Sequence, residues 1–384
     1  MSKRIIETAV PMSIDRNFPV EVFAGRLKAL NDSGVVDTMY FWDQLTSWYP
    51  RSLWTPERTP MARLIPDYDS FGDWFQMAAY GAALAPNMST IISVDSLRRG
   101  APEMIQSMLT LANITKGNAA FHLGAGELKQ SQPFGYDLST KMGRLDDFYK
   151  IFHAFWNSNE PINFDGKHTK LDQAWLGVAK NHKPKLWGLG GGPKVIDLAT
   201  SYAEGFATLV PMVWANPEHM AKEVKAIKEQ LERKGRDPEK FGFCIYVAAL
   251  IHDDEAKIDR ALDHCLMQWH ALIWGRINQA DWEKEGLTPP MGRDWHYANK
   301  LLPVNISGAE ADELLKRVTR KHVEKTWIYG TSKKVAADIQ AYVDAGATSV
   351  NILEVMTDVL TPEEAPMQVM HSIETCRLIK QANA

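Results

Sequence analysis

Cysteine, basic clusters and long apolar runs are scarce in this 384-residue chain, and each scarcity excludes a class of protein. Its three cysteines (Cys244, Cys265 and Cys376) are too far apart for a disulfide framework or a CxxC metal knuckle, which suits a reducing cytoplasm. A net charge of −4 without any long basic run argues against general nucleic-acid binding. No run of about 18 apolar residues occurs, so we expect neither a signal peptide nor a transmembrane segment.

Several catalytic signatures are also missing. The 11 histidines include no HExxH motif and no paired histidine–carboxylate spacing, so we expect no metal site. There is no GxSxG motif, and no cysteine has an activating context, so a covalent nucleophile is not expected. We interpret His153 as a structural residue of a helix, and leave open whether His122 contacts a ligand.

Short apolar runs alternate with helical patterns along the chain. With 45% hydrophobic and 23% charged residues, the composition is that of a globular protein with a large core. The pattern predicts eight strands separated by helices, over residues 5–9, 37–41, 91–94, 119–123, 185–189, 206–209, 241–250 and 349–353. Long helices are expected at 138–157, 217–234 and 255–274, among others.

This alternation predicts an α/β fold, a single (β/α)8 TIM barrel over residues 1–384 with an insertion at 278–321. The alternative is an open doubly wound sheet. Its GxGxxG fingerprint should follow the first strand, which ends in Val10-Pro11-Met12 instead.

The stretch 118–136 carries the strongest local signal. An apolar run ends in Gly124-Ala125-Gly126 and leads to the carboxylate Glu127. Glycines let the backbone approach a flat ligand closely, and the carboxyl ends of barrel strands are where such enzymes carry their active sites. The alternative is that these residues only form a turn.

Other polar and aromatic residues follow neighbouring strands and are expected at the same barrel mouth. Asp43, Gln44 and Trp48 follow the second strand, residues 93–96 end the third, and Gly190-Gly191-Gly192 follow the fifth. A glycine turn that opens a helix offers free N–H groups to a phosphate, although a tight strand-to-helix turn has the same sequence. Together these residues suit a planar, phosphorylated redox cofactor.

At this point the chain resembles the bacterial-luciferase-like superfamily of flavin and deazaflavin oxidoreductases. Within it, the chain is most similar to coenzyme F420-dependent reductases of the ketoreductase type. The resemblance covers nearly the whole chain, through segments whose order and spacing match: Tyr40-Phe41-Trp42-Asp43-Gln44-Leu45, Leu123-Gly124-Ala125-Gly126-Glu127, Pro133-Phe134-Gly135-Tyr136, Gly191-Gly192-Pro193 and Tyr329-Gly330-Thr331.

The resemblance implies a deazaflavin at the carboxyl-terminal mouth of the barrel, with a non-proline cis peptide at Ser93-Val94 supporting its ring. The implied cofactor-binding residues are Asp43, Ser93, Val94, Gly126, Glu127, Gly190, Gly191 and Gly192. The implied catalytic positions are Glu127, Trp48 and Gln44. At the last position the related sugar-phosphate dehydrogenases have a histidine, and glutamine cannot exchange a proton near neutral pH.

We therefore expect an F420-dependent oxidoreductase that transfers hydride between its cofactor and an apolar carbonyl or alcohol, or an activated alkene. Two alternatives stay open: a luciferase-like monooxygenase that uses FMN, and a deazaflavin-binding protein without turnover, which Gln44 favours. By resemblance we also expect a cytoplasmic homodimer that acts on a small molecule.

Overall fold

Eight parallel strands close into a barrel in the computed structural model, which describes residues 6–12 and 16–384. The strands are β1 (Glu7–Pro11), β2 (Thr38–Trp42), β3 (Ser89–Asp95), β4 (Ala119–Gly124), β7 (Lys185–Leu189), β8 (Gly205–Val210), β9 (Gly242–Ile251) and β11 (Ser349–Glu354). Each pairs with the next, and β11 pairs with β1 to close the circle. The predicted TIM barrel is confirmed, and each expected strand overlaps one barrel strand; residue 5 lies outside the described ranges.

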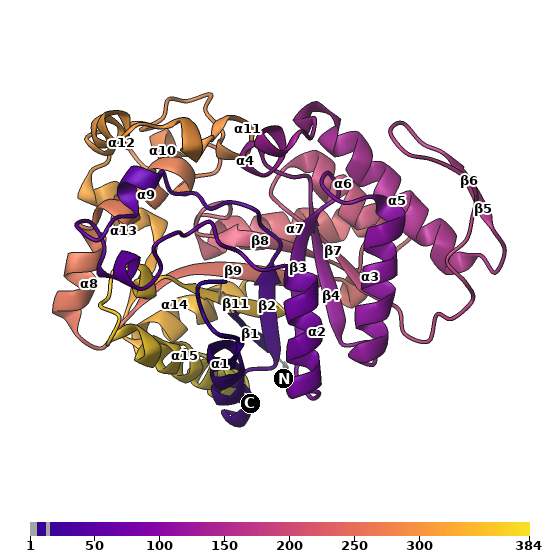
Figure 1. Ribbon diagram of the computed structural model, residues 1–384, viewed down its shortest axis with the longest axis horizontal. Helices are drawn as coiled ribbons and strands as arrows, with labels where there is room; N and C mark the ends of the chain where they lie inside the picture. The colour runs from indigo at the N-terminus through magenta and orange to yellow at the C-terminus, as the bar shows by residue number, and fades with distance from the viewer. Residues whose placement is uncertain (1–5, 13–15) are drawn as a thin grey trace.

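Helices surround the barrel (Figure 1). They are α1 (Val20–Asp32), α2 (Trp74–Leu84), α3 (Ala101–Ile114), α5 (Lys141–Asn157), α6 (Pro193–Tyr202), α7 (Pro217–Arg233), α14 (Ser332–Asp344) and α15 (Gln368–Asn383). Helix α7 illustrates why these segments are helical. Asn216 caps it by accepting a hydrogen bond from the His219 N–H at 2.8 Å, and Pro217 occupies the first turn. Its buried residues follow helical spacing: Met220, Val224, Ile227 and Leu231.

Aromatic side chains from β4, β7 and β9 pack together inside the barrel. Trp187 stacks on His122 with ring centroids 5.2 Å apart, and His122 Nδ1 lies 2.5 Å from the Tyr246 hydroxyl. A Cβ atom at Gly205 would lie 2.5 Å from the Trp187 indole, so glycine is needed there for the ring to fit. Burial lowers the pKa of His122 to about 3. His122 is therefore a neutral residue of the barrel interior at pH 7.

Two features differ from the sequence prediction. The helix expected at 255–274 is two helices, α8 (Glu255–Leu262) and α9 (Cys265–Trp274), because His264 starts a new helix by accepting a hydrogen bond from the Leu266 N–H. A short strand, β10 (Ile328–Gly330), pairs with the end of β9. Three residues are too few to show the alternation that identifies a strand.

Two excursions leave the barrel. The strands β5 (Ile162–Asp165) and β6 (Lys170–Ala174) form an antiparallel hairpin, which is the arm at the right of Figure 1. The segment 278–321 contains α10 (Asp281–Lys284), α11 (Tyr297–Lys300) and α12 (Gly308–Leu315), and α13 (Arg320–Thr326) begins at its end. In Figure 1, α11 lies beside the short helix α4 (Leu128–Ser131), which directly follows Glu127. Within the described ranges, no helix has the length and apolar character needed to cross a bilayer.

Candidate active site

Glu127 lies at the centre of a polar network at the barrel mouth. The backbone leaves β4 through Gly126, whose φ of +93° favours glycine, and Glu127 then begins α4. The Tyr297 hydroxyl of α11 donates a hydrogen bond to Glu127 Oε1 at 2.7 Å. On the other side, Lys129 Nζ lies 3.1 Å from Glu127 Oε2. The carboxylate is thus held between a hydroxyl group and an ammonium group.

Lys129 connects Glu127 with Trp48. Its side chain is only 1% exposed, its Nζ donates to the Thr46 carbonyl at 3.0 Å, and it lies 4.7 Å from the centre of the Trp48 ring. Burial lowers the pKa of Lys129, and the ion pair with Glu127 opposes that shift. Two predicted catalytic residues, Glu127 and Trp48, are therefore brought together by a lysine that the sequence analysis did not identify.

Trp48 belongs to an aromatic wall. Its ring centre is 6.3 Å from that of Trp42 and 5.2 Å from that of Trp274 on α9. The Trp269 indole N–H of the same helix donates to the Trp48 carbonyl at 2.8 Å, which fixes the Trp48 loop. An apolar surface therefore adjoins the charged pair of Glu127 and Lys129.

Some polar atoms near the mouth are buried without a hydrogen-bond partner. Among the described residues these include Gln44 Oε1, Trp42 Nε1 and Ser96 Oγ, all at the carboxyl ends of β2 and β3. A buried polar atom without a partner costs about 1–3 kcal/mol, so these atoms are suited to accept or donate bonds to a ligand. Gln44, the third predicted catalytic residue, is half-buried.

Asp43 is occupied by two arginines. Its carboxylate lies 3.2 Å from Arg98 Nη2 and 3.1 Å from Arg99 Nε, and its N–H donates to the Ser93 carbonyl at 2.9 Å. Arg98 also pairs with Asp95. Asp43 therefore ties the end of β2 to the loop after β3, and its contact with a cofactor stays a prediction.

The expected cis peptide at Ser93-Val94 is wrong. Both residues lie in the regular part of β3, where they pair with His122 and Leu123 of β4 across an extended ladder. The cis bond found in the described ranges is Val210-Pro211. Ser93 still faces the barrel interior, because its hydroxyl lies 2.8 Å from that of Tyr40.

The glycine turn Gly190–Gly192 joins β7 to α6. Gly192 is the N-cap of the helix, and Pro193 is its first residue. Within the described ranges, the N–H groups of Gly191, Gly192 and Lys194 donate to no main-chain carbonyl. Unpaired N–H groups at the positive end of a helix dipole can bind a phosphate.

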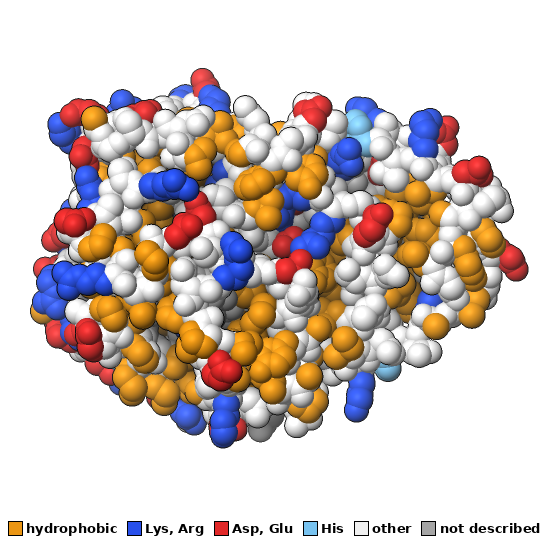
Figure 2. Space-filling model, in the orientation of Figure 1, with side chains coloured by type: hydrophobic (Ala, Val, Ile, Leu, Met, Phe, Trp, Pro, Cys, Tyr) orange, Lys and Arg blue, Asp and Glu red, His pale blue; other side chains and the backbone are white. Residues whose placement is uncertain are grey.

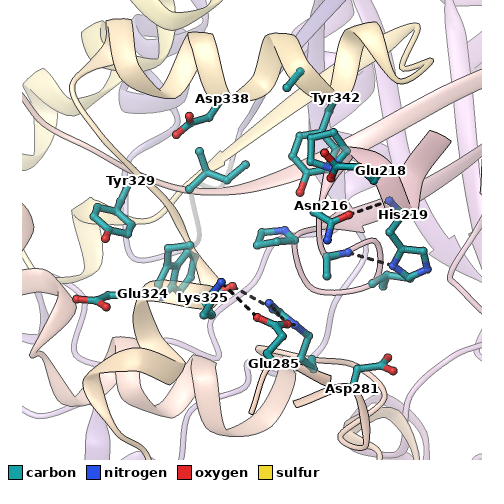
Figure 3. A pocket seen from close by; sticks show the side chains of 18 of the residues that line it. Asn216, Glu218, His219, Asp281, Glu285, Glu324, Lys325, Tyr329, Asp338 and Tyr342 are labelled. Carbon is teal, nitrogen blue, oxygen red and sulfur yellow. Dashed lines mark hydrogen bonds and ion pairs between the residues drawn. The ribbon is translucent and has the colours of Figure 1, made fainter. Parts of the chain in front are cut away.

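An open cleft of about 900 Å³ has charged and aromatic residues in its walls (Figure 3). A Cβ atom at Gly191 would lie 2.5 Å from Val213, which also lines the cleft. The other walls come from α7, α14 and the segments 276–285 and 324–329. Its charged groups are largely paired with each other, as in Arg276–Glu285, Lys284–Asp281 and Lys334–Asp338. The cleft therefore does not select ligands of one charge.

The structure adds two residues that the sequence analysis missed, Lys129 and Tyr297. A lysine on a short helix and a tyrosine in an irregular segment carry no sequence signal for a buried site. Across the described part of the chain, no group of three histidine, cysteine, aspartate or glutamate residues is arranged to hold a metal ion.

Comparisons with known proteins agree with this fold. The family described as Luciferase-like monooxygenase matches residues 51–349. The phthiodiolone/phenolphthiodiolone dimycocerosates ketoreductase of Mycobacterium kansasii is 24% identical over 317 residues, which cover 81% of this chain and 84% of that protein. The protein of the same name from Mycobacterium sp. (strain JLS) is 27% identical over 276 residues, 70% of each chain.

Solved structures with the same fold differ in their described activities. An F420-dependent secondary alcohol dehydrogenase, in complex with an F420-acetone adduct, has a TM-score of 0.71 at 15% identity, covering 97% of this chain and 99% of that chain. The EDTA monooxygenase of Chelativorans sp. BNC1 has a TM-score of 0.66 at 13% identity, covering 97% and 94%. The shared fold therefore does not identify the cofactor.

The pairing of Asp43 with Arg98 and Arg99 generates a stability prediction. Asp43→Asn should lower the free energy of unfolding by about 3 kcal/mol, because it removes the buried carboxylate that Arg98 and Arg99 share and leaves each guanidinium with one acidic partner. The control is Asp73→Asn, which removes a half-exposed partner of Arg99 but retains a good N-cap for α2. It should cost less than about 1 kcal/mol. Urea unfolding measures both, and equal losses would contradict the role given to Asp43.

Proposed function

Because the chain belongs to the luciferase-like monooxygenase family of oxidoreductases, we propose that it is a coenzyme F420-dependent enzyme. It transfers hydride between this cofactor and an apolar carbonyl or alcohol, or an activated alkene. The observation that carries the proposal is the contact of Glu127 with Tyr297 and Lys129 beside the Trp48 wall. This arrangement combines a proton-handling group with an apolar surface, which is what reduction of an apolar carbonyl requires.

The unpaired hydrogen-bonding atoms at the barrel mouth are chemically suited to a deazaflavin. Gln44 Oε1, Trp42 Nε1 and Ser96 Oγ are unpaired polar atoms that suit the edge of a polar ring system. The backbone at Gly126, Ser93 and Val94 is proposed to lie against that ring, and the N–H groups of Gly190–Gly192 to hold the phosphate. When bound in its reduced form, the cofactor supplies a hydride from C5 of its ring.

The substrate is proposed to lie against Trp42 and Trp48. Both rings are partly exposed, and large aromatic surfaces favour apolar groups. Glu127, which Lys129 links to the Trp48 ring, is then the carboxylate that orients a substrate oxygen and exchanges its proton. The names of the curated relatives, which are ketoreductases, support a carbonyl substrate.

An FMN-dependent monooxygenase is the second candidate. It is favoured by the family description and by structural neighbours named as monooxygenases, such as the long-chain alkane monooxygenase LadA. Oxygen consumption with reduced FMN would distinguish it, because a reduced deazaflavin reacts poorly with oxygen. A deazaflavin-binding protein without turnover is the third candidate, since Gln44 cannot exchange a proton.

Cofactor choice is tested by titrating the apoprotein with oxidised F420 and, separately, with FMN while following fluorescence quenching. We expect F420 to bind in roughly the micromolar range and FMN to bind more weakly. The reverse order would favour the monooxygenase. Binding of neither would mean that the glycine segments are only turns.

The role of Glu127 is tested by Glu127→Gln. We expect turnover of reduced F420 with an apolar ketone to fall about 100-fold or more, because acid–base help is lost, while F420 binding is retained. Glu239→Gln changes an exposed carboxylate elsewhere and serves as the control. Turnover like that of the wild type in Glu127→Gln would remove this residue from the mechanism.

We also propose a homodimer formed through outer helices. The outer faces of α1 and α2 expose the apolar side chains Val20, Val22, Tyr80 and Leu84. Figure 2 shows apolar side chains over the area where these helices lie in Figure 1. Light scattering should give twice the mass of one 43.3 kDa chain, and the mass of a single chain would contradict a dimer.

A further inference from the structure

We infer that Lys129 is the proton source of this site, and that it acts through Glu127. Its ammonium group replenishes the proton that the oxygen of a carbonyl substrate takes up during reduction. The inference rests on the proposed function. It assigns a role to a residue that neither the sequence motifs nor the family resemblance identified.

The site needs such a group because Gln44, the polar side chain that follows β2 at the mouth, is an amide. An amide can donate and accept hydrogen bonds but does not exchange a proton near neutral pH. Glu127 by itself is also insufficient. Its Oε1 accepts a hydrogen bond from Tyr297 at 2.7 Å, and its Oε2, which has no hydrogen-bond partner, lies 3.1 Å from the Lys129 ammonium. The two groups in contact with Glu127 that carry a proton are therefore Tyr297 and Lys129.

Tyr297 and Lys129 differ in how readily they release a proton. Burial, together with the neighbouring Glu127, raises the pKa of Tyr297 well above its ordinary value. Burial lowers the pKa of Lys129. A low-polarity environment disfavours the charged form of each group, so it holds the proton on the phenol and favours its release from the ammonium.

The surroundings of Lys129 limit where its proton can go. The Nζ contacts are the Thr46 carbonyl, the face of the Trp48 ring and Glu127 Oε2. Neither the carbonyl nor the ring takes up a proton. Besides Glu127, the charged groups that act on Lys129 are Arg98, which lowers its pKa, and Asp69, which raises it. Glu127 is therefore the acceptor in direct contact.

The proposed reduction balances as follows. The carbonyl carbon would gain a hydride (two electrons and one proton) that a bound reduced deazaflavin would supply, so that a C–H bond would replace the C=O π bond. Lys129 first passes its proton to the Glu127 carboxylate, and Glu127 then passes that proton to the substrate oxygen. Glu127 ends as a carboxylate and Lys129 as a neutral amine, and a proton from solvent returns to the amine through Glu127. Oxidation of an alcohol runs through the same steps in reverse.

Two substitutions separate supplying a proton from holding Glu127 in position. Lys129→Arg keeps a positive charge that can pair with the carboxylate, but a guanidinium group does not release its proton in proteins. Lys129→Met keeps the length of the side chain and removes both functions. Tyr297→Phe is the matched control, because it removes the other hydrogen bond to Glu127 without changing the proposed proton source.

The kinetic test uses reduced F420 with 2-nonanone as the apolar ketone. We expect both Lys129 variants to lower kcat about 100-fold or more, with the Kd for F420 within about threefold, and Tyr297→Phe to lower kcat less than about tenfold. The wild-type kcat should fall on the alkaline side with a midpoint below the ordinary lysine pKa of 10.5, and Lys129→Arg should lack this decline. An arginine variant as active as the wild type would overturn the inference.

A second measurement needs no cofactor. Since the folded protein releases the Lys129 proton at lower pH than the unfolded chain, the wild type should gain thermal stability relative to Lys129→Met as the pH rises towards 10.5. A difference in Tm that does not change with pH would contradict the lowered pKa on which the role of Lys129 depends. If the wild type leaves reduced F420 unoxidised, the proposed function fails; if only the arginine variant disagrees, the inference on Lys129 fails alone.

Discussion

The parallel pairing that closes the barrel determines where every candidate functional group lies. Because β11 pairs with β1 and all eight strands run in one direction, the loops that follow them meet at one mouth. Glu127 after β4, Trp48 after β2 and the glycine turn after β7 are distant in the chain and share this end of the barrel. An open sheet would spread the same loops along an edge, and the charged pair and the aromatic wall would not meet.

Burying an ion pair costs desolvation free energy, and the partners of the pair determine how easily its groups change protonation state. Lys129 is almost fully buried, and removing an ammonium group from water costs several kcal/mol unless its partners compensate. Here Glu127, the Thr46 carbonyl and the face of the Trp48 ring together compensate part of this desolvation cost. The arrangement stabilises the charged form only in part, and a group held in this way changes its protonation state more easily than one at the surface.

The fold was predictable because strands and helices leave periodic patterns, and the glycine turns were predictable because Gly126 and Gly192 stand at recognisable strand-to-helix transitions. The polar network was not. Tyr297 lies 170 residues from Glu127, in a segment without periodicity, so no local pattern could pair them. Lys129 resembles any exposed helical lysine until tertiary packing covers it. The cis peptide expected from the family was wrong because Ser93 and Val94 continue the β3 ladder.

The stacked Trp187 and His122 have a consequence for the order of events. Their stacked rings lie inside the barrel, where the Tyr246 hydroxyl also contacts His122. Across the mouth, α11 is attached to the opposite rim through Tyr297–Glu127 and Lys141–Asn299. Two ligands that both enter from the mouth would have to pass this attached segment. Whichever lies deeper has to arrive first and depart last, which makes the kinetic sequence of binding a property of the architecture.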